Sequence, residues 1–131
     1  METDRSKNKF DRWRESCFAI LENGSVVSCS NRSEWVEWMQ ETFSKGNHWI
    51  VEEEVEGFYI LTEFLGINHN VTGIGPPLWF ETFVFRSSAG GRLGPKMEYG
   101  TVRYSTAAEA LAGHLAICEK VKSGAIAGLT L

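Results

Sequence analysis

The chain has 131 residues, a formal net charge of −4 at pH 7, 43% hydrophobic residues and 23% charged residues. These values are typical of one globular domain, which at this size buries roughly two-thirds of the surface exposed by its unfolded chain. They exclude a disordered chain and a coiled coil, and no apolar run approaches the roughly 20 residues that cross a bilayer. We therefore expect a soluble single-domain protein that does not enter a membrane.

The ends of the chain and its cysteines indicate where the protein resides. Residues 1–14 are polar and mixed in charge, which is typical of a frayed tail and not of a signal peptide. We expect one domain over residues 15–124 and a second tail over residues 125–131. Three cysteines, an odd number in no metal-binding spacing, indicate a reducing compartment. The expected location is the cytoplasm.

The first predicted element is a β-hairpin. Residues 17–22 and 25–30 are rich in β-branched and aromatic side chains and flank Asn23-Gly24, the strongest short hairpin signal. A two-residue turn there places Cys17 and Cys29 on opposite faces of the hairpin, because side chains alternate along a strand. A disulfide between them is disfavoured.

A helix is predicted next, followed by four strands. Asn31 or Ser33 begins the helix, with Glu34 at capping-box spacing from Asn31, and Gly46 ends it. Its apolar stripe consists of Trp35, Trp38, Met39, Thr42 and Phe43. The strands comprise residues 49–55, 58–65, 78–86 and 97–104, with glycine-rich connections at 66–77 and 87–96.

The last predicted element is a helix that begins after Thr106, with Glu109 at capping-box spacing, and ends at Gly124. Its apolar face consists of Ala110, His114, Ile117 and Val121, with Leu111 and Cys118 beside it. Together, the elements predict an α+β fold. We expect one antiparallel or mixed sheet of five or six strands with two helices packed on it.

Charge is unevenly distributed along the chain. From Glu34 to Glu63 there are eight acidic residues and one lysine, a local balance of −7, whereas residues 86–104 carry a balance of +3. An acidic block argues against general nucleic-acid binding, which depends on lysine and arginine. It is either a solvated face or a surface for a basic partner. The candidate partner surface consists of Glu52, Glu53, Glu54 and Glu56.

Three residues are candidates for chemistry: His69 at the mouth of the loop, Glu81 inside an aromatic strand, and His114 on an apolar helix face. Two histidines and a carboxylate can form a facial metal site or an acid–base pair. The alternative is a separate structural role for each, since nothing in the sequence brings the three together. Cys118 follows His114 by four residues and can touch it, but apolar surroundings make a thiol inert.

A ligand pocket is a second hypothesis. The chain has sixteen aromatic residues (8 Phe, 5 Trp and 3 Tyr), and aromatic rings beside Arg and His can stack a nucleotide. An ordinary aromatic core explains the same composition. The candidate ligand-binding residues are Asn68, His69, Trp79, Glu81, His114, Arg92 and Arg103. The segment 90–96 does not match a phosphate-binding loop. It lacks the glycine that precedes the lysine, the Ser or Thr that follows the lysine, and the start of a helix.

About half of the chain carries a recognisable pattern. The matching residues are Phe64-Leu65-Gly66, Asn68-His69, Gly75-Pro76-Pro77-Leu78, Phe80-Glu81-Thr82 and Ala112-Gly113-His114. This pattern resembles a family of small uncharacterised proteins common in bacteriophage and prophage genomes. The chain differs from that pattern at Asn68, where Asp is more usual, and in a longer excursion before Tyr104. The resemblance implies a phage-encoded accessory protein that acts in the bacterial cytoplasm.

Three functions remain open from the sequence. The first is a non-enzymatic protein that binds a host or defence-system protein, as a counter-defence inhibitor does. The second is capture of a nucleotide signal, and the third is a metal-dependent hydrolase built on His69, Glu81 and His114. The absence of a catalytic motif favours binding over catalysis. No cofactor is expected unless the third hypothesis holds, which would require a divalent metal. A homodimer also remains open.

Overall fold

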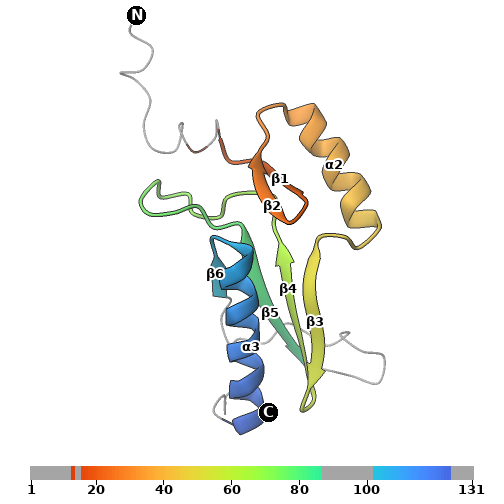
Figure 1. Cartoon of the computed structure of the whole chain (residues 1–131), viewed down its shortest axis with the longest axis vertical. Coiled ribbons are helices and arrows are strands. Elements are labelled where there is room, and N and C mark those ends of the chain that lie inside the picture. The colour runs from red at the N-terminus through yellow and green to blue at the C-terminus, as the bar shows by residue number, and fades with distance from the viewer. Residues whose placement is uncertain (1–12, 14–15, 87–101, 125–131) are drawn as a thin grey trace, which may run out of the picture.

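The structure is a computed structural model that describes residues 13, 16–86 and 102–124 of the chain. Its six strands are β1 (Ala19–Glu22), β2 (Ser25–Ser28), β3 (Trp49–Val55), β4 (Phe58–Phe64), β5 (Phe80–Arg86) and β6 (Val102–Tyr104). The two helices whose first and last residues lie within the described ranges are α2 (Arg32–Ser44) and α3 (Ala107–Ser123). The α+β prediction is confirmed (Figure 1).

The strands form two antiparallel sheets, where the sequence predicted one. β3, β4, β5 and β6 pair in chain order, and β1 pairs with β2 alone. The hairpin meets the rest of the chain through the loop after β4: Ala19 N–H donates to Gly66 O at 3.0 Å, and Asn68 N–H donates to Cys17 O at 2.8 Å. Pairing to an irregular loop cannot extend the ladder, so the hairpin stays a separate sheet.

The β1–β2 hairpin has the predicted register. Glu22 lies opposite Ser25, and Cys29 N–H donates to Phe18 O at 3.0 Å. All three cysteines are free thiols, so Cys17 and Cys29 are not joined, as their placement on opposite faces predicts.

Helix α2 packs mainly on the hairpin, and Trp38 also contacts Phe64 of β4 edge to face, with ring centroids 5.9 Å apart. Asn31 caps it by accepting from Glu34 N–H at 3.0 Å, as predicted. Trp35 Nε1–H donates to both Ala19 O and Gly66 O at 3.1 Å, tying the helix to β1 and to the loop. Gly66 has φ +79°, and a Cβ there would approach Met39 to 2.8 Å. Glycine at this position therefore lets the loop pass beneath α2.

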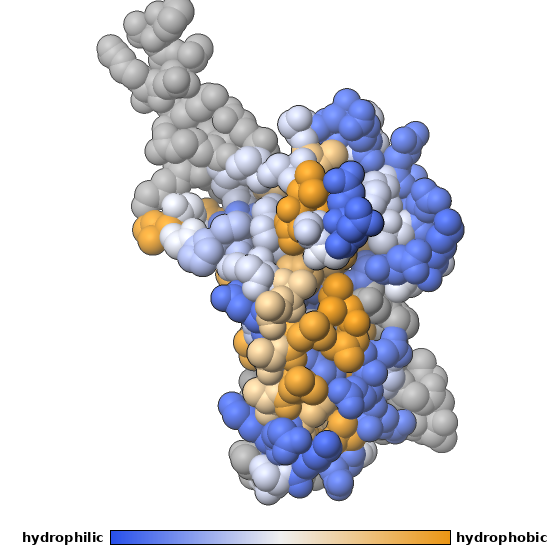
Figure 2. Space-filling view, viewed as in Figure 1, coloured by the Kyte–Doolittle hydropathy of each residue, from blue (hydrophilic) through white to orange (hydrophobic). Residues whose placement is uncertain are grey.

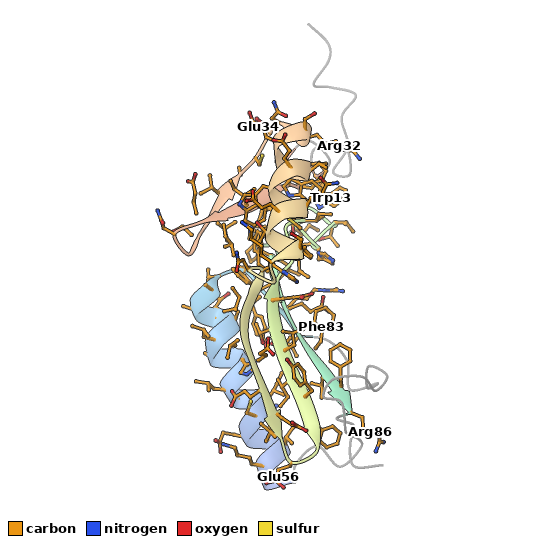
Figure 3. All side chains as sticks on the ribbon, turned by 90° about the vertical axis from the view of Figure 1, so that its right-hand side faces the viewer. Trp13, Arg32, Glu34, Glu56, Phe83 and Arg86 are labelled. Atoms are coloured by element: carbon orange, nitrogen blue, oxygen red, sulfur yellow. The ribbon has the colours of Figure 1, made fainter. Side chains whose placement is uncertain are left out.

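Helix α3 lies along one face of the four-stranded sheet, while Phe83 projects from the other face (Figures 1 and 3). Thr106 and Gly124 cap its two ends, as predicted. The core beneath it consists of Val55, Phe58, Ile60, Val84, Ile117, Cys118 and Val121. A second cluster of Ala19, Phe64, Trp79, Phe80, Tyr104 and Ala110 joins the sheet to the hairpin.

The outer side of α3 carries exposed apolar side chains. Leu111 and Leu115 are 44% and 60% exposed, so Leu111 does not join the core. Figure 2 shows hydrophobic residues gathered over α3 and the strands next to it, with hydrophilic residues around them. Within the described residues, neither helix has the length and apolar character that crossing a membrane requires.

Several predictions fall on residues outside the described ranges. These are the tail at 1–14 apart from Trp13, the tail at 125–131, the excursion at 87–96 and the first part of the return strand at 97–104. The described part of that strand is β6, which pairs with β5 as an antiparallel return should.

Candidate functional site

The structure does not bring His69, Glu81 and His114 together. His114 is on α3 and faces the helix-covered side of the sheet, where it contacts Thr62. Glu81 on β5 lies opposite Glu63 and therefore points to the other side of the sheet, because neighbouring positions alternate. His69 lies in the loop after β4, where its Nδ1 is 2.9 Å from Ile67 O. These three residues do not share a metal site.

His114 instead meets Glu53 and Thr62. Its side chain is fully buried, with Nε2 3.0 Å from Glu53 Oε1 and Nδ1 2.8 Å from Thr62 Oγ1. Glu53 comes from β3, and its side chain is 40% exposed, so the carboxylate reaches from the core to solvent. Both ring nitrogens of a buried imidazole are thereby satisfied, as burial requires.

The contact with Thr62 continues as a chain of hydroxyl groups. Thr62 Oγ1 is 2.5 Å from Thr82 Oγ1, which is 3.0 Å from Tyr104 Oη. One set of proton positions satisfies all of them: Tyr104 donates to Thr82, Thr82 to Thr62, Thr62 to Nδ1 of His114, and Nε2–H of His114 to Glu53. The network crosses β3, β4, β5 and β6 beneath α3.

Gly113 makes room for the end of this network. A Cβ built on Gly113 would overlap the ring of Tyr104. The Ala-Gly-His segment therefore serves the network twice, since Gly113 seats Tyr104 and His114 supplies the imidazole.

Cys118 lies one helical turn after His114 and completes a cluster at Glu53. Its Sγ is 3.5 Å from Glu53 Oε1, and the three donor atoms of Glu53, His114 and Cys118 all lie within 4.8 Å of one another. Burial and the nearby Glu53 carboxylate raise the pKa of the Cys118 thiol to about 11. At neutral pH the thiol is protonated and a poor nucleophile.

The order Glu53–His114–Thr62 resembles an acid–base–nucleophile series, but Thr62 has no exposed surface. A nucleophile must reach the carbon that it attacks. The Thr62 hydroxyl is enclosed by the sheet and α3, so this series does not function as a hydrolytic triad.

Glu81 belongs to a second polar group on the opposite side of the sheet. It is 3% exposed, and its Oε1 lies 3.6 Å from Arg103 Nε. Across the strand pair is Glu63, whose Oε1 lies 3.4 Å from His48 Nε2. Arg103 supplies the positive charge that a buried carboxylate requires.

The loop after β4 is held by its asparagines. Asn68 Oδ1 accepts from the backbone N–H groups of Asn70 and Leu78, each at 2.8 Å. Asn70 Nδ2 donates to Ile74 O and Pro76 O, also at 2.8 Å. The Asn68 side chain therefore acts as a loop clamp, and an Asp at this position could accept the same two hydrogen bonds.

Asn68 and Trp79 do line one open depression of about 510 Å³. Its walls are Trp13, Ser16, Ser28, Asn68, Asn70, Gly73, Gly75, Pro77 and Trp79. Trp79 is 8% exposed and therefore offers little surface to a ligand, and the Oδ1 atom of the half-buried Asn68 is already engaged within the loop. His114 and Glu81 do not line this depression, and Arg92 lies outside the described residues.

The acidic residues of β3 divide between two environments. Glu52 and Glu54 alternate with Glu53 along the strand and are exposed, as is Glu56 in the turn that follows. Glu52 accepts a hydrogen bond from Tyr59 Oη. None of the ion pairs among described residues involves Glu52, Glu54 or Glu56. Figure 3 shows Glu56 at the end of the sheet farthest from α2.

Glu53, which the sequence predicts to share a partner surface with its exposed neighbours, instead contacts the buried His114. Strand alternation contained the signal, because Glu53 lies between Val51 and Val55 on one face of a predicted strand. The four-residue spacing of His114 and Cys118 was a second signal, because it places both side chains on one face of a helix. No family model, curated protein or solved structure matches the chain.

Proposed function

We propose that this protein is a phage-encoded accessory protein of the bacterial cytoplasm that binds a host protein and performs no catalysis. A host defence protein with a basic surface is the partner class. The observation that carries the proposal is the set of exposed carboxylates at one edge of the sheet, Glu52, Glu54 and Glu56, without an ion pair among described residues.

The placement of these carboxylates favours a partner. β3 is at one end of the strand order β3-β4-β5-β6. An edge strand offers backbone groups to a partner, and its exposed side chains select the partner's charge. Like charges oppose pairing with a second copy of β3, so a basic protein fits better than a homodimer through this edge.

The two alternatives from the sequence are less well supported. Ligand capture requires free polar groups, whereas Asn68 Oδ1 already accepts two backbone hydrogen bonds within its own loop. A hydrolase built on His69, Glu81 and His114 requires the three residues to meet, and they lie apart.

Charge reversal tests the proposal. The variant E52K/E54K/E56K should fold normally and lose a stoichiometric host-protein complex that the wild type retains during purification from a bacterial lysate. The control E22K/E37K/E119K makes the same change in net charge at exposed positions elsewhere and should retain the complex. Glu53 is left unchanged because it supports His114.

Two results would contradict the proposal. One is that the wild type forms no stoichiometric complex. The other is that both triple variants retain it equally, which would place the partner on another surface.

A further inference from the structure

We propose that Glu53, His114 and Cys118 form a binding site for Zn²⁺. The three side chains come from β3 and from successive turns of α3, and their donor atoms lie within 4.8 Å of one another. They supply a carboxylate oxygen, an imidazole nitrogen and a thiol sulfur. This mixed set suits Zn²⁺, which binds all three donor types.

Two of the three donor–donor distances are close to those of a tetrahedral site. Zn–S bonds of about 2.3 Å and Zn–N or Zn–O bonds of about 2.0–2.1 Å place neighbouring donor atoms about 3.3–3.6 Å apart. The observed separations are 3.0 Å from His114 Nε2 to Glu53 Oε1 and 3.5 Å from Cys118 Sγ to Glu53 Oε1. The third separation, from His114 Nε2 to Cys118 Sγ, is within 4.8 Å, so this side of the site must close by at most roughly 1.2 Å when the ion binds.

Charge and access also fit a dication. Binding of Zn²⁺ displaces the proton of the Cys118 thiol to solvent. The resulting thiolate and the Glu53 carboxylate together carry two negative charges, which neutralise Zn²⁺ in surroundings where His114 is fully buried and Cys118 is 3% exposed. The 40% exposure of the Glu53 side chain provides a route for the ion from solvent. Three protein ligands leave one tetrahedral position for water.

Thr62 completes the arrangement from the other side of the imidazole. A histidine that binds a metal through one nitrogen usually donates its other N–H to an acceptor, which fixes the ring orientation. Thr62 Oγ1 lies 2.8 Å from Nδ1 and can accept that hydrogen bond when Nε2 binds the ion. The hydroxyls of Thr62 and Thr82 can then rotate to donate in the reverse direction, toward Tyr104.

The test uses the full chain without a polyhistidine tag, stripped with a chelator and titrated with Co²⁺ and then Zn²⁺. We expect one equivalent of Co²⁺ to bind, with a thiolate-to-cobalt charge-transfer band and the visible spectrum of four-coordinate cobalt. Zn²⁺ should abolish both signals by displacement. It should also raise the thermal midpoint, because it binds the folded state.

Two matched pairs of variants assign the ligands. Cys118→Ser should lose the charge-transfer band, whereas Cys29→Ser should keep it. Glu53→Gln should weaken Zn²⁺ binding by more than about tenfold. Removal of a residue that only hydrogen-bonds to a metal ligand can already cost about tenfold, and Glu53 is proposed to be a ligand itself. Glu54→Gln, on the adjacent exposed residue, should leave affinity unchanged. His69→Gln should also bind normally, because His69 lies elsewhere.

The site would be disproved by the absence of saturable one-to-one binding, or by a charge-transfer band that survives Cys118→Ser. Unchanged affinity in Glu53→Gln would exclude the three-ligand set. That variant retains an oxygen that can accept from His114, so it tests the site without depending on a loss of folding.

Discussion

At the scale of single residues, His114 and Glu81 show two ways of placing a polar group in the core. His114 bonds at both ring nitrogens, to Glu53 and Thr62. Glu81 instead relies on the charge of Arg103 at 3.6 Å, on the other face of the sheet. The His114 network has the greater consequence, because it connects four strands, and its hydrogen bonds from His114 through Thr62 and Thr82 to Tyr104 are buried.

Replacement of Thr62 by Val tests the contribution of this network to stability. The two side chains have nearly the same shape, but Val leaves His114 Nδ1 without a buried partner and breaks the link to Thr82. We expect a loss of about 1–3 kcal/mol in the free energy of unfolding, measured by urea denaturation. Thr42→Val is the control, since Thr42 is also buried and its hydroxyl has no hydrogen bond among described residues. An equal cost in both variants would contradict the prediction.

At the scale of elements, α3 and the loop after β4 are each shaped by a glycine that admits a neighbouring side chain. Gly66 allows the loop to pass under Met39 at the end of β4. Gly113 lets α3 settle against Tyr104 at the end of β6. The helix can then place His114 directly over Thr62.

Gly113→Ala should therefore destabilise the protein, contrary to the usual effect in a helix. In an open helix interior, Gly→Ala stabilises by roughly 0.5–1 kcal/mol. Here the added methyl group overlaps the ring of Tyr104, and overpacking of this kind costs about 1–3 kcal/mol. Thermal and urea unfolding measure the sign. In a Tyr104→Ala background the substitution should no longer destabilise, and a cost that persists there would show that Tyr104 is not the cause.

At the scale of the whole molecule, negative charge is concentrated on α2, β3 and β4. The segment from Glu34 to Glu63 has a balance of −7, and within it only Glu41, Glu53 and Glu63 belong to ion pairs among described residues. Glu53 and Glu63 pair with histidines, so Lys45 supplies the one permanent positive charge in these pairs. Self-repulsion of this kind opposes folding and favours a basic partner.

Salt should consequently stabilise the wild-type protein. The screening length falls from about 30 Å at 0.01 M to about 3 Å at 1 M ionic strength, so sodium chloride should raise the thermal midpoint. In E52K/E54K/E56K each reversal changes the charge by two, and the segment balance moves from −7 to −1. Its midpoint should depend less on salt than that of E22K/E37K/E119K. The same salt dependence in the two variants would show that the β3 carboxylates do not repel one another.

The sequence by itself determined the local structure of this protein. Asn23-Gly24 set the hairpin register, Asn31 and Thr106 began the helices, and Gly124 ended α3, because turns and caps depend on residues that are near one another in the chain. The same local logic correctly separated Cys17 from Cys29. The spacing of His114 and Cys118 is likewise a local feature that can be read from the sequence.

Only the tertiary structure decided how the six strands divide between two sheets and which polar residues meet. The Glu53–His114 and Thr62–His114 contacts join residues 61 and 52 positions apart. Glu81 and His114 lie on opposite faces of the sheet, which follows from the pairing of Glu63 with Glu81 and not from either residue's neighbours. Strand alternation assigns residues to two faces but does not say which face a distant helix covers, and that choice comes from packing across the whole chain.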